Sequence, residues 1–267
     1  MAETAATVQF ADGKAYERFM GRWSRLTGQV FIDWLGLPVG LRWLDVGCGT
    51  GASSESILAR AKPREIVAFD PSPQQIAYAR ATIEEPRIGF SAADATAFAF
   101  PEKFDVATSA LVLNFIPARD KAVANMARAV KPGGTVAAYV WDFADGRTVN
   151  RPLREAVAAL DPGAGEAERQ AMHADSTRPE ALASLFRGAG LAKVATRALD
   201  IEAVYRDFDD FWDSNTGFQN PLAKYLSGLA PERVEQIKAR LAEIIPRDGS
   251  PVRVPARAWA VRGAVPD

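Results

Sequence analysis

Three glycines at alternate positions are the residues whose spacing points most directly to ligand binding. Residues 44–51 read Leu-Asp-Val-Gly-Cys-Gly-Thr-Gly, so Gly47, Gly49 and Gly51 directly follow a short apolar run of strand type. Glycine adopts dihedral angles that a Cβ penalises, and it lets a ligand lie against the backbone itself. An ordinary strand-to-helix turn needs one glycine rather than three. The segment therefore predicts a ligand-binding turn between a strand and a helix.

Carboxylates around this turn indicate which ligand it takes. Asp45 precedes the glycines, Asp70 ends the next strand-like run, and Asp94 follows the third. An acidic side chain at Asp70 can accept hydrogen bonds from ribose hydroxyls, and Asp94 lies at a height suited to an adenine amino group. A carboxylate at Asp45 would oppose the pyrophosphate of a dinucleotide, whereas it suits a ligand with an amine and a sulfonium. The alternative for Asp70 is a turn or cap role before Pro71, and the alternative for Asp94 is an ordinary helix cap.

The elements that must position these residues alternate between strand-like and helix-like patterns. Five strand-like runs alternate with helical segments, at 41–46, 65–70, 87–91, 104–109 and 135–141. Such alternation predicts right-handed crossovers and a mainly parallel sheet. Two further β-type runs follow at 192–205 and 251–262. Helical spacing over 12–36, interrupted near Gly21, predicts two helical pieces before the first strand.

Composition narrows the class of protein. The chain has 267 residues, 48% of them hydrophobic, and a formal net charge of −1, so no general basic field favours nucleic acid. No apolar run approaches the ~20 residues that span a bilayer, and the amino terminus lacks the features of a signal peptide. One cysteine excludes an intrachain disulfide, and the single histidine has no partners at metal-ligand spacing. We therefore expect a cytoplasmic protein with no membrane, nucleic-acid or metal partner.

The motifs together resemble the class I S-adenosylmethionine-dependent methyltransferases of small-molecule type. The matching segments, in the family's order, are Leu44-Asp-Val-Gly-Cys-Gly-Thr-Gly51, Val67-Ala-Phe-Asp-Pro-Ser72, Ala93-Asp-Ala95, Phe104-Asp105 with Ala110-Leu111-Val112-Leu113, and Lys131-Pro-Gly-Gly134. The resemblance implies an α/β fold: a Rossmann-like, doubly wound, seven-stranded and mainly parallel sheet with helical cap insertions. Its antiparallel last strand, at about 251–262, would lie beside the fifth.

The resemblance also implies one methyltransferase domain over residues 1–267. Within it we expect four parts: an N-terminal helical cover at 1–40, a cofactor-binding core at 41–141, and cap insertions on the acceptor side at 142–177 and 206–250. The cofactor would be S-adenosyl-L-methionine. Its implied contacts cluster after the first four strands and comprise Asp45, Gly47, Cys48, Gly49, Gly51, Asp70, Pro71, Ser72, Asp94, Ala95 and Leu111. Asp70 would hold the ribose, and Asp94 would accept from the adenine amino group.

Residues outside these motifs could contact the acceptor. Tyr16 and Arg22, in the N-terminal helical region, could bind the cofactor carboxylate, and Arg22 could instead hold an anionic acceptor. Alternatively, both could belong to an ordinary packed helix. Asn114 and Asp142 follow the fourth and fifth strands, where ligands bind in this architecture, and Asp142 is the candidate base or the anchor of a cationic acceptor. Its alternative is a turn role before Asp145-Gly146. Aromatic residues over 205–220 could line an apolar pocket or simply pack the cap.

The sequence thus predicts an enzyme that transfers a methyl group from S-adenosylmethionine to a small-molecule acceptor, mainly by positioning the reactants in line. Tyr16, Asn114 and Asp142 are the catalytic candidates, and the chain is expected to be a monomer or homodimer. The methylated atom, oxygen, nitrogen or carbon, stays open. One alternative is a non-catalytic protein on the same fold that binds the cofactor or a partner. Another is a nicotinamide-dependent oxidoreductase, which Asp45 disfavours.

Overall fold

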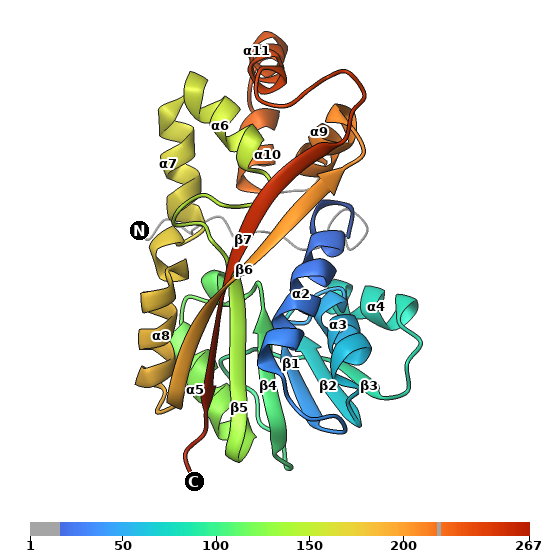
Figure 1. Cartoon of the computed structure of the whole chain (residues 1–267), viewed down its shortest axis with the longest axis vertical. Coiled ribbons are helices and arrows are strands. Elements are labelled where there is room, and N and C mark those ends of the chain that lie inside the picture. The colour runs from blue at the N-terminus through green and yellow to red at the C-terminus, as the bar shows by residue number, and fades with distance from the viewer. Residues whose placement is uncertain (1–16, 218–219) are drawn as a thin grey trace.

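The computed structural model describes residues 17–217 and 220–267, and its centre is a single seven-stranded sheet (Figure 1). The strand order is β3-β2-β1-β4-β5-β7-β6. The strands are β1 (Arg42–Val46), β2 (Glu65–Asp70), β3 (Ile88–Ala92), β4 (Phe104–Ala110), β5 (Val130–Trp141), β6 (Ala192–Tyr205) and β7 (Val252–Ala264). The first five pair in parallel, and β7 pairs antiparallel with both β5 and β6. The predicted fold class is therefore confirmed, including the antiparallel strand beside the fifth.

The fifth strand begins earlier than the sequence pattern predicts. β5 starts at Val130, directly after helix α5 (Arg119–Ala129), whereas the pattern places its start at Thr135. Val130 pairs with Phe104, and the register then shifts before Thr135 pairs with Val106. Gly133, which has a φ of +73°, lies within this irregular segment. A bulge of this kind adds residues without ending the strand. Because the segment contains a proline and two glycines, the sequence pattern predicts a turn there instead.

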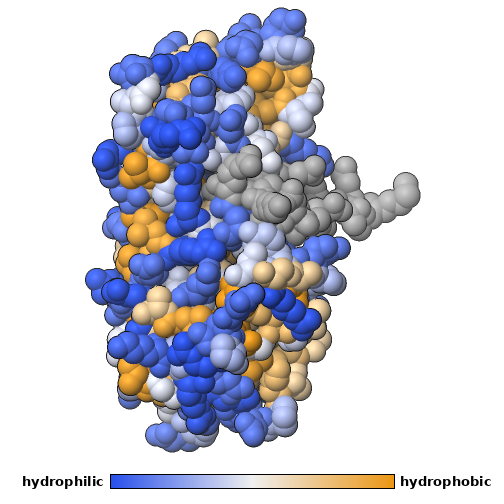
Figure 2. All heavy atoms as spheres, turned by 90° about the vertical axis from the view of Figure 1, so that its right-hand side faces the viewer, coloured by the Kyte–Doolittle hydropathy of each residue, from blue (hydrophilic) through white to orange (hydrophobic). Residues whose placement is uncertain are grey.

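Helices cover both faces of the sheet because successive strand residues point to opposite sides. Helices α2 (Arg22–Leu35), α3 (Ala52–Ala61) and α4 (Pro73–Thr82) lie on one face, and α5 and α8 (Pro179–Gly188) lie on the other (Figure 1). Trp43 of β1 packs into the apolar cluster that contains Phe31 and Ile57, and its neighbour Leu44 packs into the cluster with Val123 and Phe186. On the face seen in Figure 2, hydrophilic groups predominate and apolar groups form separate patches.

The N-terminal helix is tied to the glycine turn. A π-helical turn, η1 (Glu17–Gly21), runs directly into α2. Arg25 of α2 pairs with Glu17 at 2.5 Å and with Glu55 of α3 at 2.6 Å. The hydroxyl of Thr50, inside the glycine turn, donates to Glu17. These contacts place the start of α2 over the carboxyl end of β1.

A second group of helices gathers around the far ends of β6 and β7. It comprises α6 (Arg151–Leu160), α7 (Pro162–Ala171), η3 (Ala174–Thr177), α9 (Phe208–Thr216), α10 (Pro221–Ser227) and α11 (Pro231–Ala242) (Figure 1). The antiparallel pair β6 and β7 extends beyond the parallel strands and carries these helices, which we call the cap. Among the described residues, the helices that form are too short or too polar to cross a bilayer.

Candidate active site

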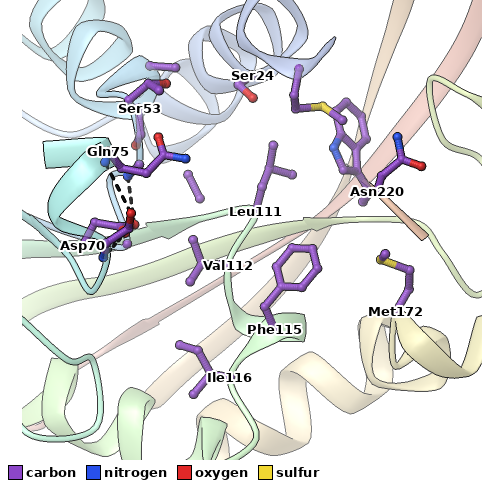
Figure 3. A pocket seen from close by; sticks show the side chains of 18 of the residues that line it. Ser24, Ser53, Asp70, Gln75, Leu111, Val112, Phe115, Ile116, Met172 and Asn220 are labelled. Carbon is purple, nitrogen blue, oxygen red and sulfur yellow. Dashed lines mark hydrogen bonds between the residues drawn. The ribbon is translucent and has the colours of Figure 1, made fainter. Parts of the chain in front are cut away.

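A cavity of about 800 Å³ opens between the carboxyl ends of the parallel strands and the cap. Its volume lies within the ~300–1,000 Å³ of typical ligand sites, and its position is where α/β sheets bind ligands. The lining comes from the glycine turn, the segments after β2, β4 and β5, helix α2 and the cap. Figure 3 shows Asp70, Ser53 and Gln75 on one side of this space and Met172 and Asn220 on the opposite side.

Each glycine of the turn has a positive φ, of 75° at Gly47, 55° at Gly49 and 94° at Gly51. A Cβ at Gly47 would lie 2.7 Å from Val112, and one at Gly51 would collide with Ile83. At Gly49 nothing comes nearer than 4.0 Å. Close packing thus explains the first and last glycines, while Gly49 presents bare backbone to the cavity.

The amides of the turn donate into the protein. Gly47 and Cys48 donate to the carbonyl of Phe69 at 2.8 and 3.0 Å, and Gly49 donates to Oδ2 of Asp70 at 3.1 Å. Oδ1 of Asp70 accepts the amide of Ser72 at 2.9 Å. A pyrophosphate site would instead aim such amides at the ligand. This turn therefore offers a ligand a carboxylate rather than a row of amide donors.

A second carboxylate lies beneath the turn and outside the cavity lining. Asp45 is fully buried, and its Oδ2 accepts the hydroxyl of Ser54 at 2.7 Å. Burial raises the pKa of Asp45 to about 6, with a further contribution from the charge of Asp70. Burial, Asp45 and Asp70 together raise the pKa of the Cys48 thiol, so this cysteine stays protonated. The local field is negative and favours a positively charged ligand.

Seven of the predicted cofactor residues line the cavity: Gly47, Cys48, Gly49, Asp70, Pro71, Ser72 and Leu111. Leu111, directly after β4, has a φ of +60°, which is a strained conformation for leucine. Its amide donates to the carbonyl of Tyr139 at 2.8 Å, and this bond holds the strained residue against β5. The strain thus lies at the cavity wall.

Asp94 and Ala95 lie outside the lining. Oδ1 of Asp94 accepts the amide of Thr96 at 2.7 Å and its hydroxyl at 2.8 Å. These bonds lower the pKa of Asp94. Ala95 is buried, and its carbonyl accepts from Asn125. Asp94 thus closes a turn with Thr96 and caps no helix, and its contact with adenine stays a prediction.

Arg22 is likewise turned away from the cavity, contrary to the prediction that it binds the cofactor carboxylate. Its guanidinium pairs with Asp210 of α9 at 3.2 Å, donates to Ser214 at 3.0 Å, and stacks on the rings of Trp23 and Tyr205. Arg22 therefore joins the N-terminal helix to the cap. Tyr16, the other residue predicted there, lies outside the described residues.

Asn114 and Asp142 are buried, but neither lines the cavity. Oδ1 of Asp142 accepts the amide of Asp145 at 3.1 Å, which is the turn role that stood as its alternative. Their neighbours Phe115 and Trp141 line the cavity instead. The prediction chose the polar residue of each pair. Trp141 and Asp142 point to opposite sides because they are adjacent at the end of β5. Asn114 and Phe115 lie in a 3-10 turn, η2 (Leu113–Phe115), where adjacent side chains are about a third of a turn apart.

The aromatic stretch over 205–220 mostly packs the cap. Phe208 and Phe211 are buried in the main apolar cluster and do not line the cavity. Phe218 lies outside the described residues. Asn220, at the end of this stretch, does line the cavity.

Sequence reasoning missed a buried polar group in the cap. Glu168 of α7 lines the cavity and is 6% exposed. It pairs with Arg154 of α6, with 2.6 Å between Nε and Oε2. Burial raises the pKa of Glu168, which the charge of Arg154 and a hydrogen bond from Asn150 partly offset. The pair joins two helices of an insertion without any motif, so no sequence signal marks it.

Comparisons with known proteins agree on one family. The family described as "Methyltransferase domain" matches residues 44–134. The chain is similar to 2-methyl-6-phytyl-1,4-hydroquinone methyltransferase of Synechocystis sp., with 39% identity over 117 residues, which is 42% of this chain and 36% of that protein. Demethylmenaquinone methyltransferase of Renibacterium salmoninarum is 38% identical over 114 residues, covering 42% and 45%. Trans-aconitate 2-methyltransferase of Methylobacterium radiotolerans is 32% identical over 121 residues, covering 45% of each chain. The chain spans less than half the length of these relatives.

Solved structures share the fold at lower identity. Phosphoethanolamine N-methyltransferase 2 of Haemonchus contortus, in complex with S-adenosyl-L-methionine, has a TM-score of 0.61 at 14% identity, covering 98% of this chain and 61% of that one. The cyclase SpnF has a TM-score of 0.54 at 20% identity, covering 100% and 89%. At these identities the likeness concerns the fold alone, and the fold accommodates more than one activity.

Proposed function

Because the chain belongs to the class I S-adenosylmethionine-dependent methyltransferases, we propose that it transfers a methyl group from S-adenosylmethionine to a small-molecule acceptor. One observation carries the proposal. The amides of the glycine turn point inward, Asp70 lies at the cavity floor, and Asp45 lies buried beneath it. Such a floor suits a cationic adenosine derivative and disfavours a dinucleotide pyrophosphate.

The chain's own residues fit this cofactor. Asp70 lines the cavity beside the glycine turn, and the proposal assigns it the ribose hydroxyls. Gly49 offers unobstructed backbone for close approach, and Leu111 covers the opposite wall. Bound S-adenosylmethionine would supply an activated methyl group on a positively charged sulfur. Among the described residues, the lining contains no group of three or more side chains that could hold a metal ion.

The protein must also position the acceptor against the cofactor and exclude water from the cavity. Apolar side chains of Met20, Phe115, Trp141 and Met172 supply most of the wall between the cofactor side and the cap. Alignment of two reactants in such a cavity can contribute ~7–11 kcal/mol of barrier lowering. The burial of Asp142 and Asn114 away from the cavity is therefore compatible with transferase activity.

A methyl-transfer screen tests the proposal. The protein is incubated with S-adenosylmethionine and a panel of hydroxylated, amino and carbon-nucleophile acceptors, and S-adenosylhomocysteine is measured. We expect acceptor-dependent product with at least one class and none with Asp70→Ala. Tight cofactor binding without product from any class would instead support the non-catalytic alternative.

A further inference from the structure

The strand order divides the cavity into two compartments. Asp70 ends β2, and Trp141 ends β5, which lies three strands away in the order β2-β1-β4-β5. Neighbouring strands are about 4.8 Å apart, so these two positions are separated by roughly 14 Å along the edge of the sheet. Figure 3 places Leu111 and Phe115 between the Asp70 side and the side of Met172 and Asn220. If the cofactor occupies the Asp70 side as proposed above, the acceptor faces Trp141 and the cap.

The acceptor compartment is largely apolar, and the indole N–H of Trp141 in its wall has no partner among the described residues. Phe115, Phe143, Val149 and Met172 supply apolar lining. Trp141 is 4% exposed and lines the cavity, and its Nε1 has no hydrogen-bond partner among the described residues. An indole N–H can only donate, and leaving such a donor unpaired costs about 1–3 kcal/mol. An oxygen or other acceptor atom of a ligand beside Trp141 would satisfy this donor.

The charge of the compartment selects against anions. Glu168 is the carboxylate that lines this side, and its charge is compensated by Arg154, which does not line the cavity. Among the described residues, the lining includes no lysine and no arginine, and its basic side chain is that of His173. A polycarboxylate placed here would lose its hydration and meet Glu168, and the single imidazole of His173 could compensate at most one of its charges.

We propose that the acceptor is an uncharged, mainly apolar molecule that carries a hydroxyl or carbonyl oxygen, and that this oxygen accepts a hydrogen bond from Nε1 of Trp141. Trp141 is then a specificity-determining residue at the end of β5. The inference rests on the proposed function, because it assumes that the cofactor fills the Asp70 side. It separates the two acceptor chemistries named among the relatives, since a hydroquinone fits this compartment and trans-aconitate does not.

The test uses matched probes and a variant that removes the donor and keeps an aromatic ring. Protein saturated with S-adenosylhomocysteine is titrated with 1-naphthol, naphthalene and 1-naphthoate, which share one ring system and differ in the hydroxyl or the charge. In the unmodified protein we expect 1-naphthol to bind about three- to tenfold more tightly than naphthalene, as one net hydrogen bond implies, and 1-naphthoate to bind most weakly. Trp141→Phe keeps an aromatic ring but lacks the N–H, so naphthol and naphthalene should bind it equally.

Trp259→Phe is the matched control, because Trp259 lies on the neighbouring strand β7 and outside the cavity lining. It should preserve the preference for naphthol, and thermal unfolding verifies that both variants are folded. Tighter binding of 1-naphthoate, failure of 1-naphthol to bind, or a preference for naphthol that survives in Trp141→Phe would overturn the inference. Failure of S-adenosylhomocysteine itself to bind would contradict the proposed function, so the two failures are distinguishable.

Discussion

Asp70 accepts the amide of Gly49 at 3.1 Å, which ties the end of the second strand to the middle of the glycine turn. The same carboxylate accepts the amide of Ser72 through its other oxygen. Burial raises the pKa of Asp70, and these two bonds partly offset the rise. One side chain thus fixes the turn and places a negative charge at the cavity floor.

Replacing Asp70 should weaken cofactor binding. Asp70→Asn removes the charge and one acceptor from a site where charged hydrogen bonds contribute about 1.5–3 kcal/mol, so affinity for S-adenosylhomocysteine should fall roughly 10- to 100-fold. Asp94→Asn is the control, because Asp94 lies in an exposed turn bonded to Thr96. Calorimetric titration that shows equal losses in both variants would restore the adenine contact predicted for Asp94.

Gly47 should be intolerant of a side chain. Gly47→Ala places a Cβ 2.7 Å from Val112 and forces a non-glycine residue to a φ of +75°, so we expect a loss of about 2–4 kcal/mol in the free energy of unfolding. Urea unfolding of Gly47→Ala and of Gly47→Ala/Val112→Ala separates the two causes. Val112→Ala is measured as well. Crowding contributes if the double variant loses less stability than the sum of the losses in the two single variants. Gly40→Ala is a control with a positive φ and open space around its Cβ position.

Asp45 should make stability depend on pH in mild acid. Its folded pKa of about 6 lies above its ordinary value of 3.8, so between those values the folded protein holds a proton that the unfolded chain has released. The free energy of unfolding should therefore decrease as pH rises from about 4 to 6, by about 3 kcal/mol at most, and Asp45 adds no further change above that range.

The contribution of Asp45 is isolated by comparing Asp45→Asn with the unmodified protein in urea at pH 4, 5, 6 and 7. The stability of the variant relative to the unmodified protein should rise across this series. A constant difference between the two proteins would show that Asp45 titrates alike in the folded and unfolded states.

The Arg154 and Glu168 pair should be costly to break from one side. Arg154→Met leaves a buried carboxylate without its cation, which typically costs about 3–5 kcal/mol. Arg154→Met/Glu168→Gln removes that charge and should recover much of the loss at neutral pH. Arg151→Met is the control on the same helix, because its pair with Glu155 is half-exposed and should contribute less than about 1 kcal/mol. An Arg154→Met variant as stable as Arg151→Met would show that Glu168 is not buried in solution.

Local patterns predict the sheet well, because each strand and its following turn are encoded in one stretch of sequence. The glycine turn, Asp70 and the β-type runs at 192–205 and 251–262 are of this kind. The acceptor side is different. Trp141 and Asp142 are adjacent. Which of them faces the cavity depends on which alternate residues of β5 point to that face of the sheet.

The cap is less predictable for a further reason. Glu168 reaches the cavity because α7 packs against α6, where Arg154 compensates its charge. Arg22 fits a cofactor contact by position, but Asp210 and Ser214 of α9 bind its guanidinium. Such pairings between segments far apart in the chain follow from tertiary packing and leave no local pattern.

The identity of the cofactor is the central claim, and calorimetric titration of the unmodified protein with S-adenosylhomocysteine and with NAD tests it most directly. The inward amides of Gly47, Cys48 and Gly49, together with Asp45 and Asp70, predict micromolar binding of S-adenosylhomocysteine and no heat with NAD. Binding of NAD without binding of S-adenosylhomocysteine would contradict the account.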